Sequence, residues 1–140
     1  MCNMLTEKDY CDYETCVALK ELEYVGSSRY YYTQRDHKFH YDAYNKFYTV
    51  RTADAMGYVL AVHLYEAQKW LREEKKTGVF ISGFIDGYTF WVYNLLSGDT
   101  LYQGFFNNET GKKYESYEEA LSEGIKEAVK ILKENETTHR

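Results

Sequence analysis

The sequence predicts an α+β protein in which helices pack on one face of an antiparallel β-meander, preceded by an N-terminal helix and tyrosine-rich short strands. Two apolar runs flank the dipeptide Asp86-Gly87, which favours a tight hairpin between them. Ser116-Tyr117-Glu118-Glu119 has the capping-box pattern and precedes an apolar stripe of helical spacing. A length of 140 residues fits a single domain, with weaker halves at 10–51 and 52–134.

The N-terminal half begins with a helix predicted over residues 13–22. Asp12 is suited to cap its start, because its side chain accepts a bond from a free N–H group of the first turn. Short strands are expected at 29–33, 37–41 and 46–50, separated by polar turn residues. The consecutive tyrosines of the first strand fit a strand that contacts something on both faces.

Two interpretations remain open for residues 52–76. Apolar residues at helical spacing are compatible with one long helix that begins at Thr52. The alternative is a buried strand at 58–62 followed by a helix over about 64–76. Gly57 and the β-branched residues after it weaken the long helix, so the sequence favours the second interpretation.

The meander is expected to consist of strands at 79–85, 88–96 and 100–106. With a two-residue loop at Asp86-Gly87, Ile85 would lie opposite Tyr88, and this register fixes which side chains share a face. One face is then mainly aliphatic. The other is expected to carry Phe80, Phe84, Trp91 and Tyr93, joined by Tyr102 and Phe106 if the second loop also has two residues.

Both faces of the predicted meander are apolar, so both need to be covered. Helices can cover the aliphatic face, including the last helix, whose buried stripe is predicted to be Tyr117, Leu121, Ile125, Ala128 and Leu132. Gly124 within this helix indicates close packing against a neighbour. For the aromatic face the candidate covers are the tyrosine-rich strands, a second subunit or a ligand.

No motif in the chain identifies a reaction, and the sequence predicts no catalytic residue and no cofactor. Asp36, His37, His40 and Asp42 have side chains that can bind zinc, but residues 37 and 40 of a strand point to opposite faces. We therefore expect no metal site here. The three cysteines, Cys2, Cys11 and Cys16, form no complete zinc motif and are expected to be free thiols.

The net charge of −5 argues against a general nucleic-acid-binding protein. The order helix, three strands, helix matches double-stranded-RNA-binding domains, but acidic residues stand where those domains place phosphate-binding lysines. Duplex binding is therefore disfavoured. The start of the chain is no signal peptide and no segment is apolar enough to span a membrane, so a cytoplasmic location is expected.

Three segments, YETCVALKEL at 13–22, LYEAQKWLRE at 64–73 and SYEEALSEGIKEAVKIL at 116–132, resemble small uncharacterised proteins of gut Bacteroidetes and of their phages and mobile elements. Where members often have Pro-Thr or Pro-Ser before the middle helix, this chain has Val62-His63. The resemblance covers about residues 9–134. It implies a bacterial or phage-infected cytoplasm, but no mechanism and no site residues.

The leading functional prediction is a non-catalytic binding protein that engages a host or viral protein, or holds a small nucleotide-like ligand, through tyrosine and tryptophan side chains. Candidate ligand-binding residues are Arg29, Tyr30, Tyr32, Arg35, His37 and His40, and the aromatic face of the meander is a candidate interface, including that of a homodimer. The alternative is a protein that binds single-stranded nucleic acid by stacking, and the third option is a small enzyme.

Overall fold

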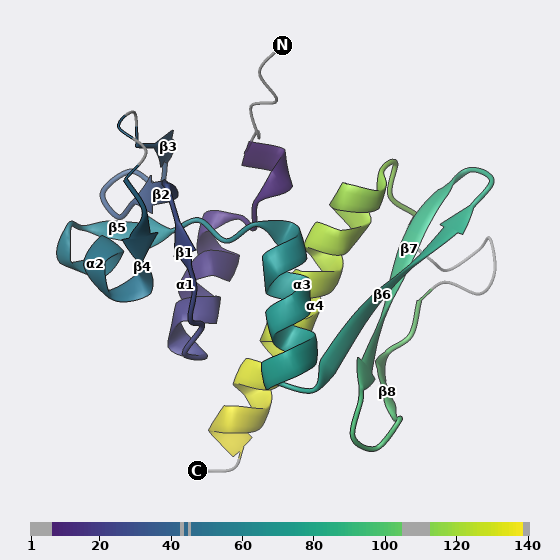
Figure 1. Ribbon diagram of the computed structural model, residues 1–140. Coiled ribbons are helices and arrows are strands. Elements are labelled where there is room, and N and C mark those ends of the chain that lie inside the picture. The colour runs from purple at the N-terminus through teal and green to yellow at the C-terminus, as the bar shows by residue number, and fades with distance from the viewer. Residues whose placement is uncertain (1–6, 43, 45, 105–112, 139–140) are drawn as a thin grey trace. The chain divides into compact units, whose positions relative to one another are not determined.

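The computed structural model describes residues 7–42, 44, 46–104 and 113–138 (Figure 1). It confirms the predicted α+β class with antiparallel sheets. The chain divides into two compact units, Met1–His63 and Leu64–Arg140. The division falls later than the expected boundary after residue 51, because residues 58–60 form a strand that pairs with the tyrosine-rich strands of the first unit.

The first unit contains short elements. These are a 3₁₀ turn (Glu7–Asp9), α1 (Tyr13–Glu21), β1 (Ser27–Ser28), β2 (Tyr30–Thr33), β3 (Phe39–Tyr41), β4 (Tyr48–Thr49), α2 (Val50–Ala55) and β5 (Tyr58–Leu60). β2 lies between β3 and β5 in a three-stranded antiparallel sheet, and β1 pairs with β4 in a separate two-stranded ladder. The strand predicted at 46–50 is thus reduced to two residues outside the main sheet.

The helix boundaries follow from local capping. Asp12 caps α1 by accepting a hydrogen bond from the Thr15 N–H at 2.8 Å, as predicted. Thr49 and Thr52 form a reciprocal capping pair that starts the short helix α2, which the sequence reading did not separate from its neighbours. The single long helix from Thr52 is wrong, since α2 ends at Ala55 and β5 intervenes before the next helix.

The centre of the first unit includes two buried thiols. Cys11 and Cys16 are free, as predicted, whereas Cys2 lies outside the described residues. The Cys16 thiol donates to the Cys11 carbonyl at 3.5 Å and its sulfur accepts from the Val62 N–H at 3.4 Å. The hydrogen bond with Cys16 and burial raise the pKa of Cys11 well above its ordinary value. The Cys11 thiol is therefore protonated at neutral pH and acts as a packing group.

The second unit is a helix, a three-stranded meander and a long helix, as the sequence predicted. Its elements are α3 (Leu64–Glu74), β6 (Thr77–Phe84), β7 (Gly87–Asn94), β8 (Thr100–Tyr102) and α4 (Tyr117–Thr138). Both helices pack on the same face of the sheet (Figure 1). None of the helices in the described parts of the chain is both long and apolar enough to cross a membrane.

The hairpin register differs from the prediction by two residues. The loop is Ile85-Asp86, and Gly87 begins β7 opposite Phe84. Asp86 is held by Lys113 at 2.7 Å, and the backbone of Tyr114 approaches Gly87 so closely that an added Cβ would lie 3.0 Å from the Tyr114 oxygen. The glycine serves this contact rather than the turn. A two-residue shift leaves every side chain on its predicted face.

Tyr102 is the exception to the predicted faces. An irregularity in the β7–β8 ladder between Val92 and Tyr93 places Tyr102 opposite Val92, on the helix-covered face. Its ring stacks on Phe90 with centroids 4.7 Å apart. The prediction assumed a regular two-residue loop, which this bulge breaks. Phe106 lies outside the described residues.

α4 approaches the sheet most closely at Gly124. A Cβ added there would lie 2.6 Å from Cγ1 of Val79 and 3.1 Å from Cγ of Phe90. This confirms the predicted close packing. Of the predicted stripe, Leu121, Ile125 and Ala128 are fully buried, while Tyr117 and Leu132 are partly exposed.

Replacement of Gly124 by alanine tests this contact. Overpacking costs about 1–3 kcal/mol, which exceeds the gain of about 1 kcal/mol that alanine brings to a helix interior, so the second unit should become less stable. Urea denaturation followed by tryptophan fluorescence measures it, because both tryptophans, Trp70 and Trp91, belong to this unit. Ser122→Ala on the same helix is the control. An equal or higher midpoint for Gly124→Ala would contradict the packing argument.

Candidate functional site

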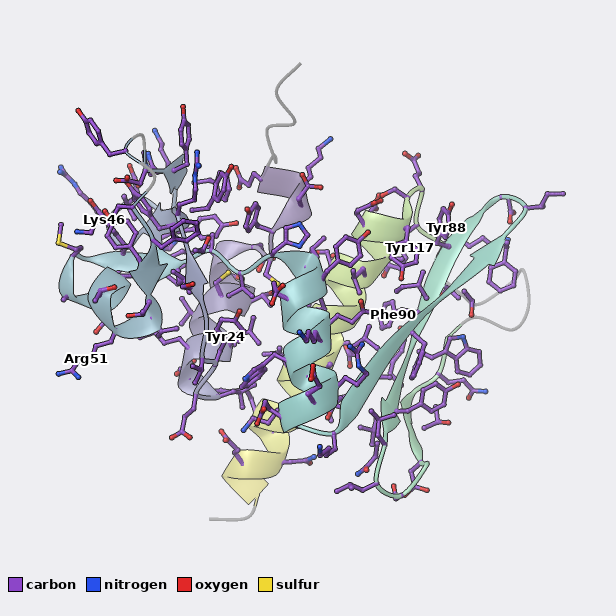
Figure 2. All side chains as sticks on the ribbon, in the orientation of Figure 1. Tyr24, Lys46, Arg51, Tyr88, Phe90 and Tyr117 are labelled. Atoms are coloured by element: carbon purple, nitrogen blue, oxygen red, sulfur yellow. The ribbon has the colours of Figure 1, made fainter. Side chains whose placement is uncertain are left out.

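Two groups of aromatic side chains are candidates for a functional surface. One surrounds β2 in the first unit, where ten of the 16 tyrosines of the chain lie. The other lies on β6 and β7 in the second unit. Figure 2 shows Phe90 directed from β7 toward α4, whereas Lys46 and Arg51 point away from the first unit.

The sheet around β2 divides the tyrosines between two faces, because successive side chains of a strand alternate. Tyr30 and Tyr32 share one face with Tyr41 and Phe39, which lie opposite them on β3. We call this the Tyr30 face. Tyr31 lies on the other side, the Tyr31 face. The consecutive tyrosines therefore do contact groups on both faces of the strand, as expected.

The Tyr30 face is a continuous cluster of rings. Tyr30 lies 4.8 Å from Tyr10 and 5.5 Å from Phe39, measured between ring centroids. The guanidinium of Arg29 lies 5.7 Å from the Tyr30 centroid and 5.8 Å from that of Tyr41, within cation–π range. Tyr41 is 47% exposed, whereas Tyr30 and Arg29 are partly covered, so the Tyr41 ring forms the surface edge of this cluster.

Tyr32 belongs to the core and not to the surface on which the sequence placed it. Its side chain is 1% exposed, and its hydroxyl donates a hydrogen bond to the Cys11 carbonyl at 2.7 Å. Burial raises the pKa of Tyr32 far above its ordinary value. A ring in this position supports the sheet and offers nothing to a ligand.

His37 and His40 lie on opposite faces, but not through strand alternation as predicted, because β3 begins at Phe39 and His37 lies before it with a φ of 60°. His37 is in the turn after β2 and stacks on Tyr13 of α1, with centroids 3.6 Å apart. His40 stacks on Tyr31 at 5.6 Å. Arg35 is exposed in the same turn as His37. The six candidate ligand residues therefore do not form one site. Arg29 and Tyr30 belong to the Tyr30 face, Tyr32 to the core, Arg35 and His37 to the segment after β2, and His40 to the Tyr31 face.

The described residues of the first unit include an ion pair, between Lys20 and Asp54, and the Asp54 carboxylate also accepts from the Gln34 side chain. Within the described residues no group of three or more histidine, cysteine, aspartate or glutamate side chains is placed to hold a metal ion. The Lys46 ammonium lies 5.2 Å from the Tyr48 ring centroid, on the Tyr31 side of the sheet. It is therefore separated by the sheet from the Arg29 cation.

A pocket of the first unit is lined by Cys16, Lys20, Tyr24, Val50, Tyr58, Val59, Leu60 and Val62. The space inside it is about that of one water molecule. A nucleotide needs a cleft of several hundred Å³, roughly 300 or more. This pocket therefore does not fit the nucleotide-like ligand that the sequence left open.

The second unit presents four aromatic side chains on the face of the sheet opposite the helices. We call this the aromatic face, and it consists of Phe80, Phe84, Trp91 and Tyr93. Phe80 lies edge-on to Tyr93 at 5.5 Å, and Trp91 is parallel to Tyr93 at 6.2 Å. Phe80 is 48% exposed and Phe84 is 44% exposed. The predicted interface residues, Tyr102 excepted, do share one face.

Two apolar side chains in the loops of the meander are exposed as well, and the sequence did not single them out. Ile85 in the hairpin loop is fully exposed, and Leu96 in the next turn is largely exposed. The available signal was the presence of large aliphatic residues at turn positions, where polar residues are usual. Charged residues are absent from both β6 and β7.

Comparison with protein-family models, with curated proteins and with solved structures found no match. Function is therefore argued from the arrangement of side chains alone.

The tyrosine cluster makes the first unit sensitive to alkaline pH. Burial, aided by a hydrogen bond with Tyr58, raises the pKa of Tyr31 from 10 to about 12, and burial also raises the pKa of Tyr10 and Tyr32. A tyrosine with a raised folded pKa stabilises the fold fully below pH 10, and this stability is lost as the pH rises through the folded pKa.

We therefore expect the far-UV circular dichroism to stay constant up to about pH 10 and to fall between pH 10 and 12, together with a cooperative rise in tyrosinate absorbance. Ionisation of all tyrosines near pH 10 with an unchanged circular dichroism spectrum would show that the cluster is not buried as described.

Proposed function

We propose that this chain is a non-catalytic binding protein whose aromatic face docks onto a protein partner. The observation that carries the proposal is the half-exposed state of Phe80 and Phe84 on a sheet that is already packed against helices on its other side. Large apolar side chains held in this way cost free energy in water. A partner surface that covers them recovers that free energy.

The aromatic face has the composition of an interface centre. Aromatic residues are enriched and charged residues are depleted at the centres of protein–protein interfaces. Rings also lose little conformational entropy on binding, and here the contacts among Phe80, Trp91 and Tyr93 restrict them before a partner arrives. An apolar patch on the partner would fit the rings, while at the Phe84 end the Lys113 ammonium, which pairs with Asp86, lies 6.0 Å from the ring centroid.

A protein partner is favoured over a small ligand by shape. The aromatic face is a sheet surface with exposed rings, while the small pocket of the first unit has room for about one water molecule. The resemblance implies a bacterial or phage-infected cytoplasm, and the partner proposed in that setting is a host or viral protein. The same resemblance contributes no residue to the argument.

The substitution Phe80→Glu tests the proposal by placing a charge in the middle of the aromatic face. Burial of an unpaired carboxylate opposes docking, so affinity for the partner should fall by at least about tenfold. Proteins captured from a bacterial lysate on the immobilised wild-type chain are compared with those captured on the variant, and the affinity of a purified candidate is then measured.

Phe47→Glu is the matched control, because Phe47 is an exposed phenylalanine of the first unit. It should capture the same partner as the wild-type chain. Tryptophan fluorescence establishes that the second unit of Phe80→Glu is folded. Equal binding by the folded Phe80→Glu variant, or loss of binding only with Phe47→Glu, would overturn the assignment of the aromatic face.

A second candidate function, binding of single-stranded nucleic acid, is favoured by the position of Arg29. Its guanidinium lies 5.7 Å and 5.8 Å from the ring centroids of Tyr30 and Tyr41, and Tyr41 is 47% exposed. Bases stack on such rings, and arginine adds a cation beside the phosphates. The separation of Arg29 from Lys46 by the sheet limits the basic surface, which places this function second.

The salt dependence of oligonucleotide binding tests this second candidate. Affinity for a short single strand should fall steeply as salt rises, because phosphate contacts release counterions. Tyr41→Ala should weaken binding about tenfold or more by removal of one stacking ring. Tyr44→Ala is the control for a highly exposed tyrosine. Absence of binding at about 50 mM salt would eliminate this function.

A further inference from the structure

The outer edge of β6 is long and lacks the features by which sheet edges usually avoid pairing. β6 spans eight residues at the end of the strand order β6-β7-β8. Natural edge strands are usually protected by lysine, proline, a bulge or short length. Thr77–Phe84 contains no charged residue and no proline, and its ladder to β7 runs without a shift.

The direction of the backbone N–H and C=O groups along β6 can be deduced from hydrogen bonds on the other edge of β7. Tyr88 exchanges both backbone hydrogen bonds with Tyr114, at 2.9 Å and 2.8 Å. Its backbone therefore points away from β6, so the pair Gly83–Tyr88 is a non-hydrogen-bonded pair. Hydrogen-bonded and non-hydrogen-bonded pairs alternate along an antiparallel ladder, so Ile81 and Val79 also belong to non-hydrogen-bonded pairs. The N–H and C=O groups of Val79, Ile81 and Gly83 point outward from the sheet.

Part of this edge is already used. The Gln68 side chain of α3 donates a hydrogen bond to the Val79 carbonyl at 2.8 Å, as expected for a carbonyl that points outward. Ile81 and Gly83 remain as the outward pair nearer the hairpin loop. Among the strands that the structure describes, none pairs with this edge.

We propose that the β6 edge pairs antiparallel with β6 of a second copy of this chain, about a two-fold axis at Ser82. Ile81 of one copy then forms a hydrogen-bonded pair with Gly83 of the other, and the reverse pair forms across the axis. Ser82 lies opposite itself. The Val79 carbonyl keeps its bond to Gln68, because this register does not require it.

The side chains agree with this register on both faces. On the aromatic face, Phe80 of each copy lies opposite Phe84 of the other in non-hydrogen-bonded pairs, where facing side chains are closest. On the helix-covered face, Ile81 lies opposite a glycine, which leaves room for its branched side chain. The strand carries no charge, so no like charges face each other within the paired β6 strands.

The area available predicts a weak dimer. Two half-exposed phenylalanines offer each copy about 200 Å² of apolar surface. Stable complexes bury about 800 Å² on each partner. Pairing of β6 strands should therefore be concentration-dependent and become visible only at tens of micromolar, as roughly expected for a small interface. The inference does not rest on the proposed partner, although pairing would make the aromatic face continuous across six strands.

Charge variants at Ser82 test both the edge and the position of the axis. Ser82→Lys and Ser82→Glu each place like charges side by side at the axis and should abolish self-association. An equimolar mixture of the two variants should regain it, because opposite charges then face each other. Sedimentation velocity at about 10 to 200 μM covers the range expected of a weak interface.

Cysteine cross-linking provides a second measurement that does not depend on how well charged variants fold. Side chains of a non-hydrogen-bonded pair lie close enough for a disulfide, so Ser82→Cys should give a covalent dimer under mild oxidation. Ser97→Cys, at an exposed turn position of the same unit, is the control and should remain monomeric.

The outcomes separate this inference from the proposed function. Loss of self-association in both single variants and its return in the mixture support the β6 dimer, whatever partner is captured. A wild-type chain that stays monomeric at about 200 μM, or Ser82→Cys that cross-links no faster than Ser97→Cys, overturns it. Self-association that survives both charge variants but is lost in Phe80→Glu would instead place the dimer contact on the aromatic face alone.

Discussion

The contact of α4 with the β6–β7 ladder at Gly124 determines the arrangement of the second unit. Because Gly124 has no side chain, the helix backbone reaches Val79 and the ring of Phe90 at van der Waals distance. This brings the helix down onto the face formed by odd-numbered residues of β6 and even-numbered residues of β7. The other face is left to Phe80, Phe84, Trp91 and Tyr93. The position of the aromatic face is thus a consequence of where the helix packs.

In the first unit, aromatic side chains fill the interior instead of forming one exposed face. Its sheet is too short to bury a large aliphatic core, and tyrosine rings fill both sides of β2. Tyrosine permits this because its ring packs while its hydroxyl finds a partner, as Tyr32 does with the Cys11 carbonyl. Tyr32 and Tyr48 are therefore interior groups, while Tyr30, Tyr31 and Phe39 are partly covered and Tyr41, Tyr44 and Phe47 are exposed.

Local patterns in the sequence predicted the elements well and the contacts between them less well. Asp12, Gly57 and Ser116 each marked a boundary through chemistry that acts over a few residues, and α1, the break before β5 and α4 begin or end near them. The predicted position of the hairpin loop was wrong by one residue on each strand. The loop is fixed by contacts with Lys113 and Tyr114, which lie far along the chain and give no local signal. Tyr102 was placed on the wrong face for a similar reason, since no local signal marks the bulge beside Val92. The candidate ligand residues were grouped because they are close in the sequence. Neighbouring residues of a strand lie on opposite faces, so this group does not form one site.

The two surfaces assigned to the second unit share the side chains of Phe80 and Phe84, but the backbone hydrogen bonds of the edge come from other residues of β6. Side-chain direction and backbone hydrogen bonding both alternate with a period of two along an antiparallel strand. Even-numbered residues of β6 direct their side chains, including the rings of Phe80 and Phe84, to the aromatic face and their backbone N–H and C=O groups to β7. Odd-numbered residues direct their side chains to the helices and their backbone groups to the open edge. A ring on the aromatic face can therefore be replaced without removing an edge hydrogen bond, because the two properties reside on alternate residues. Selection acting on partner contacts at Phe80 and Phe84 would thus leave the hydrogen-bonding edge at Ile81 and Gly83 intact.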